Sequence, residues 1–161
     1  LSVLSQAAEH KKGMVIAVNK WDLVPKDGGT MAQYTKYLQQ YLGTLNHVPL
    51  VYTSAVTKQR VYELLDTALE VAEEREKRIQ TSDLNDVIQA AIEQKHPPTT
   101  SSGAFVKIKY ATQVREAPPV FVFFANHPGG IRESYRRYLE GELREAFGFE
   151  GVPLTLVFKA K

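Results

Sequence analysis

Two short apolar runs, each followed by a polar loop and an amphipathic helix, constrain the fold of this chain most. Residues 14–18 form a continuous apolar run, typical of a strand that is buried on both faces of a parallel sheet. Residues 48–52 form a second run. Apolar spacing typical of helices precedes the first run in residues 1–12 and follows the two runs in residues 30–42 and 61–78. This alternation predicts a doubly wound α/β sheet that binds ligands at the carboxyl ends of its strands.

The second half of the chain has a different pattern. Helical spacing in residues 81–95 is followed by a polar connector at 96–103, which we expect to be structureless, and then by two strand-like segments. A further amphipathic helix and a last strand complete the order helix, strand, strand, helix, strand. The expected segments are 104–113, 120–126, 131–147 and 153–158. We therefore predict two domains, residues 1–80 and 81–161, the second with an antiparallel or mixed sheet and helices on one face.

Composition excludes several classes of site. The 161 residues contain no cysteine, which rules out disulfides and thiolate metal sites and is compatible with a reducing cytoplasm. The four histidines are scattered, so we expect no metal site. No apolar run is long enough to cross a bilayer. The net charge of +2 gives no bulk attraction to nucleic acid.

The residues Asn19-Lys20-Trp21-Asp22 follow the first apolar run directly and have the N-K-x-D arrangement that reads guanine. A carboxylate at Asp22 would accept two hydrogen bonds, from the ring N–H and the exocyclic amine of guanine. Adenine offers no amine there, so it would leave a desolvated charge unpaired. Asn19 would bridge the loop and approach the other edge of the base. The stem of Lys20 would lie along the base plane or hold the phosphate loop.

A second polar turn, Thr53-Ser54-Ala55, ends the next apolar run. In a guanine pocket, the backbone N–H of Ala55 would donate to the guanine oxygen and Ser54 would shape the turn. Four letters with one wild card can coincide by chance. Two such loops in adjacent crossover units and in the right order favour a guanine site.

The elements that hold phosphates are missing from the sequence. It contains no G-x-x-x-x-G-K-[S/T] loop, and Asp27-Gly28-Gly29 has the wrong spacing for a D-x-x-G loop. Hydrolysis of GTP depends on positioning and charge at the phosphates. We therefore expect no catalytic residue in this segment and no GTP hydrolysis by it alone.

With these motifs the chain resembles the C-terminal part of the Der (EngA) family of bacterial GTPases, which have two consecutive G domains and a KH-like domain. The resemblance departs at the glycine-rich turn 127–131 and at the connector 99–103, which is poorer in basic residues. It extends through residues 81–85, 96–98, 106–113, 118–119, 121–126, 134–140 and 143–151.

The resemblance implies that residues 1–80 end the second G domain and that 81–161 are KH-like. It also implies GTP or GDP as ligand, with Mg²⁺ held by residues outside this segment. A cytoplasmic role in maturation of the large ribosomal subunit follows from it too, with ribosomal RNA, ribosomal proteins and the protein's own upstream G domains as partners.

KH domains clamp nucleic-acid backbone with a GxxG loop between two helices. Here Gly148-Phe149-Glu150-Gly151 joins a helix to a strand, so we interpret it as a helix end with Phe149 packing back. Tyr135 and Tyr138 are expected to serve in packing. A basic patch for ribosomal RNA could form from Lys107, Lys109, Arg136 and Arg137.

The rival hypothesis is a stand-alone KH-like module that binds RNA or protein and has no nucleotide function. A phosphate-binding loop upstream of Leu1 would favour the GTPase, whereas RNA binding by residues 81–161 with a steep salt dependence would favour the module.

Overall fold

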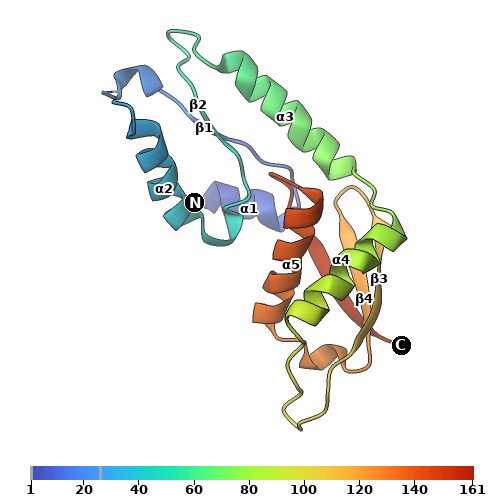
Figure 1. The fold of residues 1–161 in the computed structure, drawn as a ribbon. Coiled ribbons are helices and arrows are strands. Elements are labelled where there is room, and N and C mark those ends of the chain that lie inside the picture. The colour runs from blue at the N-terminus through green and yellow to red at the C-terminus, as the bar shows by residue number, and fades with distance from the viewer. Residues whose placement is uncertain (1, 26) are drawn as a thin grey trace. The chain divides into compact units, whose positions relative to one another are not determined.

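The computed structural model describes residues 2–25 and 27–161, and it divides into two compact units (Figure 1). Unit 1 contains the chain up to Glu74 together with Glu150–Val152, and unit 2 contains Arg75–Phe149 and Pro153–Lys161. Leu1, in the first expected helix, and Lys26, in the expected loop, lie outside the described residues. The domain limits 1–80 and 81–161 remain a prediction.

Unit 1 has the expected alternation of strands and helices. Its strands are parallel neighbours, with Ile16 opposite Leu50 and Val18 opposite Tyr52. The last two residues of its final helix belong to unit 2. The elements are α1 (Ser2–Glu9), β1 (Ile16–Val18), the 3₁₀ turn η1 (Trp21–Leu23), α2 (Thr30–Leu42), the 3₁₀ turn η2 (Gly43–Leu45), β2 (Leu50–Tyr52) and α3 (Val61–Glu76).

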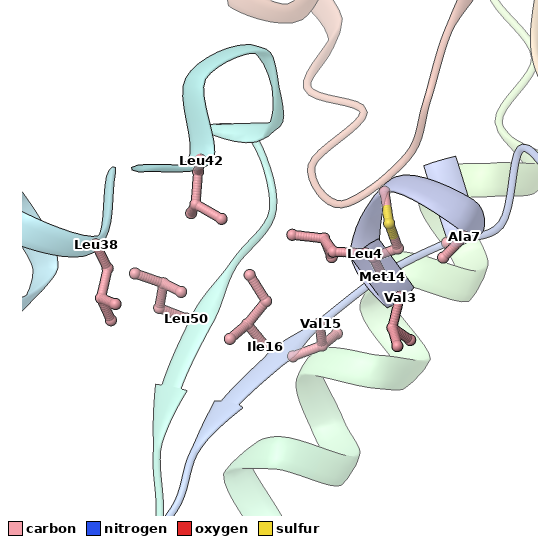
Figure 2. Close-up of a pocket in the computed structure, with 10 residues that line it drawn as sticks. Val3, Leu4, Ala7, Met14, Val15, Ile16, Leu38, Leu42 and Leu50 are labelled. Carbon is pink, nitrogen blue, oxygen red and sulfur yellow. The ribbon is translucent and has the colours of Figure 1, made fainter. Parts of the chain in front are cut away.

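The first apolar run is not buried on both faces, so that expectation is wrong. Ala17 in the middle of β1 is exposed, and Ile16 and Val18 are only half-buried. The physical reason is that the described part of unit 1 has a sheet of two strands, which leaves apolar surface uncovered. Side chains from α1, α2, β1 and β2 line an open apolar hollow of about 610 Å³ (Figure 2).

Residues 150–152 complete unit 1 from the far end of the chain. The N–H of Met14 donates to the Gly151 carbonyl at 2.8 Å, and the N–H of Gly151 donates to the His47 carbonyl at 2.8 Å. Gly151 has a φ of +69°, and a Cβ there would lie 2.6 Å from the Met14 carbonyl oxygen and 2.7 Å from Cγ2 of Val71. Only glycine fits this conformation and this space.

Unit 2 has the expected order of elements and a mixed sheet, which confirms that prediction. The strand order is β3-β4-β5, with β3 antiparallel and β5 parallel to β4. Helices α4 and α5 lie on one side of the sheet (Figure 1). Fully buried side chains of the core include Leu84, Leu139, Phe121 and Phe123. The elements are α4 (Thr81–Gln94), β3 (Ile108–Arg115), β4 (Val120–Ala125), the 3₁₀ turn η3 (Pro128–Gly130), α5 (Glu133–Phe147) and β5 (Thr155–Ala160).

The connector 96–103 contains no helix or strand, as expected, but it is locally ordered. Thr100 donates its N–H to the Ala104 carbonyl at 2.9 Å and accepts the Ala104 N–H on its hydroxyl at 3.0 Å, and these two bonds close a compact turn. One local expectation is wrong, because the strand that follows begins later than expected, at Ile108.

The side chain of Asn85 on α4 hydrogen-bonds the backbone of β3 at the outer edge of the sheet. Its amide Nδ2 donates to the Ala111 carbonyl at 2.9 Å, and its Oδ1 accepts the Ala111 N–H at 2.8 Å. Since β3 has a strand neighbour on one side only, its other side would present unpaired backbone groups. One side chain thus pairs both backbone groups of a residue whose side chain is fully buried.

Replacing Gly151 with alanine is expected to lower the free energy of unfolding of unit 1 by at least about 2 kcal/mol, because the Cβ is forced against backbone at positive φ. Fluorescence of Trp21, the one tryptophan of the sequence, reports this unit during urea denaturation. Gly28→Ala is the matched control, since no atom of the described residues lies within 4 Å of a Cβ there. It should change stability by no more than about 0.5 kcal/mol. Equal effects of the two variants would contradict the packing described for Gly151.

Asn85→Leu should destabilise unit 2 by about 2 to 4 kcal/mol, because the N–H and carbonyl of Ala111 lose their partners. Urea denaturation followed by far-UV circular dichroism measures the change. Gln89→Leu, on the same helix but exposed, serves as control. An Asn85 variant as stable as the control would show that the edge needs no partner.

Candidate functional site

The parallel hydrogen bonding of β1 and β2 continues beyond both strands. The N–H of Thr53 donates to the Val18 carbonyl at 2.9 Å, and the Thr53 carbonyl accepts the N–H of Trp21 at 3.0 Å. The two polar loops expected to form the site therefore begin side by side in unit 1.

The two loops are also joined by a side chain. The backbone N–H of Ala55 donates to Oδ1 of Asn19 at 3.2 Å. Asn19 thus bridges the loops, as the sequence predicted. The N–H of Ala55, which we expected to donate to a guanine oxygen, has Asn19 as its partner in this structure.

The side chain of Asp22 contains an unpaired polar atom. Its Oδ1 is buried and has no hydrogen-bond partner among the described residues. Buried polar atoms are almost always hydrogen-bonded, so an orphaned carboxylate oxygen needs an explanation. A ligand that donates hydrogen bonds at this position would supply the missing partner.

Lys20 has a left-handed backbone, with φ 62° and ψ 31°. Non-glycine residues rarely adopt this conformation, and it costs about 1 to 2 kcal/mol. Such outliers cluster at binding sites, where the surrounding structure holds them in place. Lys20 lies between Asn19 and η1, so its backbone conformation sets the direction in which the loop continues towards Asp22.

Trp21 anchors the loop, a role that the motif did not predict because this position is its wild card. Only 2% of the Trp21 surface is exposed. Its ring lies 5.2 Å from that of Tyr34 on α2, edge to face, and 4.4 Å from that of Tyr52 on β2. The large apolar side chain of Trp21 was the signal that could have predicted this role, since a lone tryptophan beside two apolar runs is usually buried. Burial of this ring holds the residues on either side of it in register with β2.

Ser54 shapes the second loop, as expected. It is fully buried, and its hydroxyl accepts the N–H of Thr57 at 3.1 Å. Its N–H donates to the Gln59 carbonyl at 3.1 Å, which closes the turn. Lys58 and Arg60 have positive φ values of 59° and 53°. The loop that presents Ala55 is therefore internally hydrogen-bonded.

In unit 2 the structure confirms the packing roles predicted for three aromatic residues. Phe149 is fully buried, with its ring 5.8 Å from that of Phe121. Tyr135 donates to the Lys95 carbonyl at 2.7 Å and Tyr138 donates to the Ala91 carbonyl at 2.9 Å. Burial raises the pKa of Tyr135 to about 12.

The end of α5 also agrees with the sequence. Gly148 caps the helix with a φ of +86°, so the glycine pair at 148 and 151 is a helix end and not a loop between helices.

The four predicted RNA-contact residues lie on different parts of unit 2. Lys107 and Lys109 are exposed at and just before β3. The Arg136 guanidinium lies 4.7 Å from the Phe158 ring on β5, on the other side of β4. Arg137 is 3.5 Å from Glu133. A patch that joins all four stays a prediction.

No group of three or more histidine, aspartate or glutamate side chains among the described residues is arranged to hold a metal ion. None of the described helices combines the length and the apolar character that crossing a membrane requires.

Comparison with known proteins assigns the chain to a family. Residues 78–159 match the family described as the KH-domain-like region of EngA bacterial GTPase enzymes, C-terminal. The chain belongs to this family. Its mixed sheet β3-β4-β5 with α4 and α5 is the part that the match covers.

Curated relatives extend the likeness to the whole chain. All 161 residues align at 48% identity with GTPase Der of Chloroherpeton thalassium. The corresponding values are 45% for GTPase Der of Chlorobaculum tepidum and 44% for that of Chlorobium chlorochromatii. The chain spans 36 to 37% of the length of these relatives.

Removing the bridge between the loops should expose the Ala55 amide. In Asn19→Ala the N–H of Ala55 loses its acceptor, and its hydrogen exchange should accelerate about 5-fold or more. Amide exchange followed by NMR measures this. Asn46→Ala, in the turn after η2, is the control, and the Thr53 amide should keep its protection in both variants. Unchanged exchange at Ala55 in Asn19→Ala would contradict the bridge.

Proposed function

We propose that this chain supplies the base-reading half of a guanine-nucleotide-binding GTPase, with Asn19, Lys20, Asp22, Ser54 and Ala55 around the base. The observation that carries the proposal is the orphaned Oδ1 of Asp22 in a loop that is tied to Ala55 through Asn19. The name of the relatives, GTPase Der, and their alignment over the whole chain support it.

Selection would rest on the Asp22 carboxylate. Guanine presents two donors on one edge, the ring N–H and the exocyclic amine, and these suit the two oxygens of a carboxylate. Adenine presents an acceptor and no amine there. It would leave Oδ1 buried without a partner, and an unpaired group of this kind costs several kcal/mol.

The remaining roles follow from the loop geometry. The Ala55 N–H, now bonded to Asn19 Oδ1 at 3.2 Å, would turn to the guanine oxygen, and the Asn19 amide would be free to approach the base. Lys20, held in its left-handed conformation, would lay its stem along the base plane. Buried Trp21 and Ser54 would keep both loops in place.

The phosphates and Mg²⁺ would be held by residues that precede this segment. Such an upstream part of the same G domain would add strands to β1 and cover the apolar hollow of unit 1 (Figure 2). Without it, the chain would bind guanine weakly and hydrolyse nothing. In the family setting, the intact protein would act in the cytoplasm as a GTP-dependent switch during assembly of the large ribosomal subunit.

A KH-like module without nucleotide function is the second candidate, because the family match covers residues 78–159 only. The upstream coding sequence separates the two. A G-x-x-x-x-G-K-[S/T] loop within roughly 120 residues before Leu1 supports the GTPase. An upstream sequence that lacks this loop supports the module.

Asp22→Asn in the protein with its upstream sequence should exchange nucleotide preference. The amide offers one donor and one acceptor in place of two acceptors, so affinity for GDP should fall about 100-fold or more, while xanthosine diphosphate should bind better. Competition against a fluorescent nucleotide measures both affinities. Asp66→Asn, on the exposed side of α3, is the matched control and should keep the preference for GDP. Unchanged preference in Asp22→Asn would refute the pocket.

A further inference from the structure

The two edge strands of the sheet in unit 2 differ in how their outer sides are covered. On β3, the side chain of Asn85 pairs the N–H and the carbonyl of Ala111. β5 is the last strand of the order β3-β4-β5, so its backbone has a strand neighbour on one side only. No hydrogen bond from the described residues reaches its outer side. We call this outer side of β5 the open edge.

The pairing of β5 with β4 shows which backbone groups the open edge presents. The N–H of Thr155 donates to the Pro119 carbonyl at 3.1 Å, so the backbone groups of Thr155 face β4. Successive residues of a strand direct these groups to opposite sides, so those of Val157 also face β4. The N–H and carbonyl groups of Leu156 and Phe158 point away from it. Donors and acceptors therefore alternate along the open edge, as the backbone of a further extended chain requires.

Positive charge lies on both faces of the sheet at the open edge. The Phe158 side chain lies on the helix side, because the Arg136 guanidinium of α5 is 4.7 Å from the centre of its ring. Lys159, the next residue, is exposed and by strand alternation points to the opposite face. Neither cation forms an ion pair with a carboxylate of the described residues.

The Arg136 side chain is held in place while part of it stays available. Its Nε donates to the Ile131 carbonyl at 3.3 Å, and the guanidinium stacks on Phe158. Its two terminal nitrogens have no hydrogen-bond partner in the part of the chain that the structure describes. A guanidinium presents such N–H groups in a planar fork that fits a carboxylate. On a strand paired with β5, the side chain opposite Phe158 would lie on this same face, next to Arg136.

We propose that the open edge binds an acidic segment of a partner protein in extended conformation, which adds a fourth strand to the sheet of unit 2. The backbone of the segment pairs with Leu156 and Phe158, and two adjacent acidic side chains meet Arg136 on one face and Lys159 on the other. Lysine on an edge strand disfavours pairing with a strand that brings no negative charge. A polynucleotide fits less well, because phosphates offer acceptors only and leave the edge carbonyls unpaired. The guanine pocket plays no part in this contact, so either proposal can fail alone.

Synthetic peptides test the chemistry of the partner. The full 161-residue chain is titrated into a fluorescein-labelled peptide of about eight residues, the length of one edge strand, and followed by fluorescence anisotropy. The peptide has two adjacent glutamates at its centre and threonine and valine elsewhere. Replacing both glutamates with lysine should weaken binding about tenfold or more, because attraction becomes repulsion.

Methylated peptides test whether the contact is made by strand pairing. Two further glutamate peptides carry N-methyl groups at every odd or at every even position. Only one set of peptide N–H groups can face β5, so one of the two should bind about tenfold or more weakly and the other as the unmodified peptide does. Equal binding of both would show that charge alone holds the peptide, and the proposed strand pairing would be wrong.

Amide exchange and substitutions locate the contact on the chain. With the glutamate peptide bound, exchange at Leu156 and Phe158 should slow about tenfold or more, whereas Val157, already paired with β4, should keep its rate. Arg136→Ala should weaken binding about fivefold or more, and Arg136→Lys should restore part of the loss because it keeps the charge. Arg115→Ala removes an exposed arginine at the far edge of the sheet and should bind normally. Circular dichroism checks that the three variants fold.

Several outcomes would overturn the inference. It is wrong if the chain binds none of the peptides, if the glutamate and lysine peptides bind equally, or if exchange at Leu156 and Phe158 stays the same on binding. Displacement of the peptide by an oligouridylate of about 12 nucleotides that itself slows exchange at these two amides would identify a nucleic-acid contact instead. Slow exchange there in the chain alone, together with a dimer in analytical ultracentrifugation, would identify a second copy as the occupant.

Discussion

The candidate site depends on the parallel pairing of two very short strands. Because β1 and β2 run in the same direction, their carboxyl ends meet at one edge, and the ladder continues there through Thr53 to both Val18 and Trp21. A shift of the register by one residue would turn every side chain of the strand to the other face. The bridge from Asn19 to Ala55 would be lost with it. Three residues on each strand therefore position all five residues of the proposed site.

The site combines a rigid support with an unsatisfied group. Trp21 is packed against two tyrosines, and Ser54 closes its own turn, so neither loop needs a ligand for its shape. The Asp22 oxygen, by contrast, is buried and has no donor in the part of the chain that the structure describes. Leaving such a group unpaired lowers stability, and structures tolerate this mainly where binding restores the hydrogen bond. The buried anchor, Trp21, and the residue with the unpaired oxygen, Asp22, are neighbours in one four-residue motif.

The sequence predicted most of the fold because periodicity is a local property. The limits of α2 agree with the pattern to the residue, and the order of elements in unit 2 was correct. Burial of residues 14–18 was predicted wrongly, because burial depends on neighbouring strands that the local pattern cannot reveal. Of the candidate site, the motif predicted the bridging side chain of Asn19, and the contact of Asp22 with a base stays a prediction. The anchoring by Trp21 and the hydrogen-bonded turn at Thr100 arise from tertiary contacts and local bonds that no spacing rule contains.

The return of residues 150–152 to unit 1 has a consequence for biosynthesis. A chain leaves the ribosome from its N-terminus, so β1, β2 and the loops of the site emerge before unit 2. The carbonyl of Gly151 that pairs with Met14 emerges 137 residues after Met14, when nearly all of unit 2 has been made. Unit 1 cannot reach its final hydrogen bonding during its own synthesis. A nascent chain stalled before this glycine would hold both loops on an unfinished scaffold.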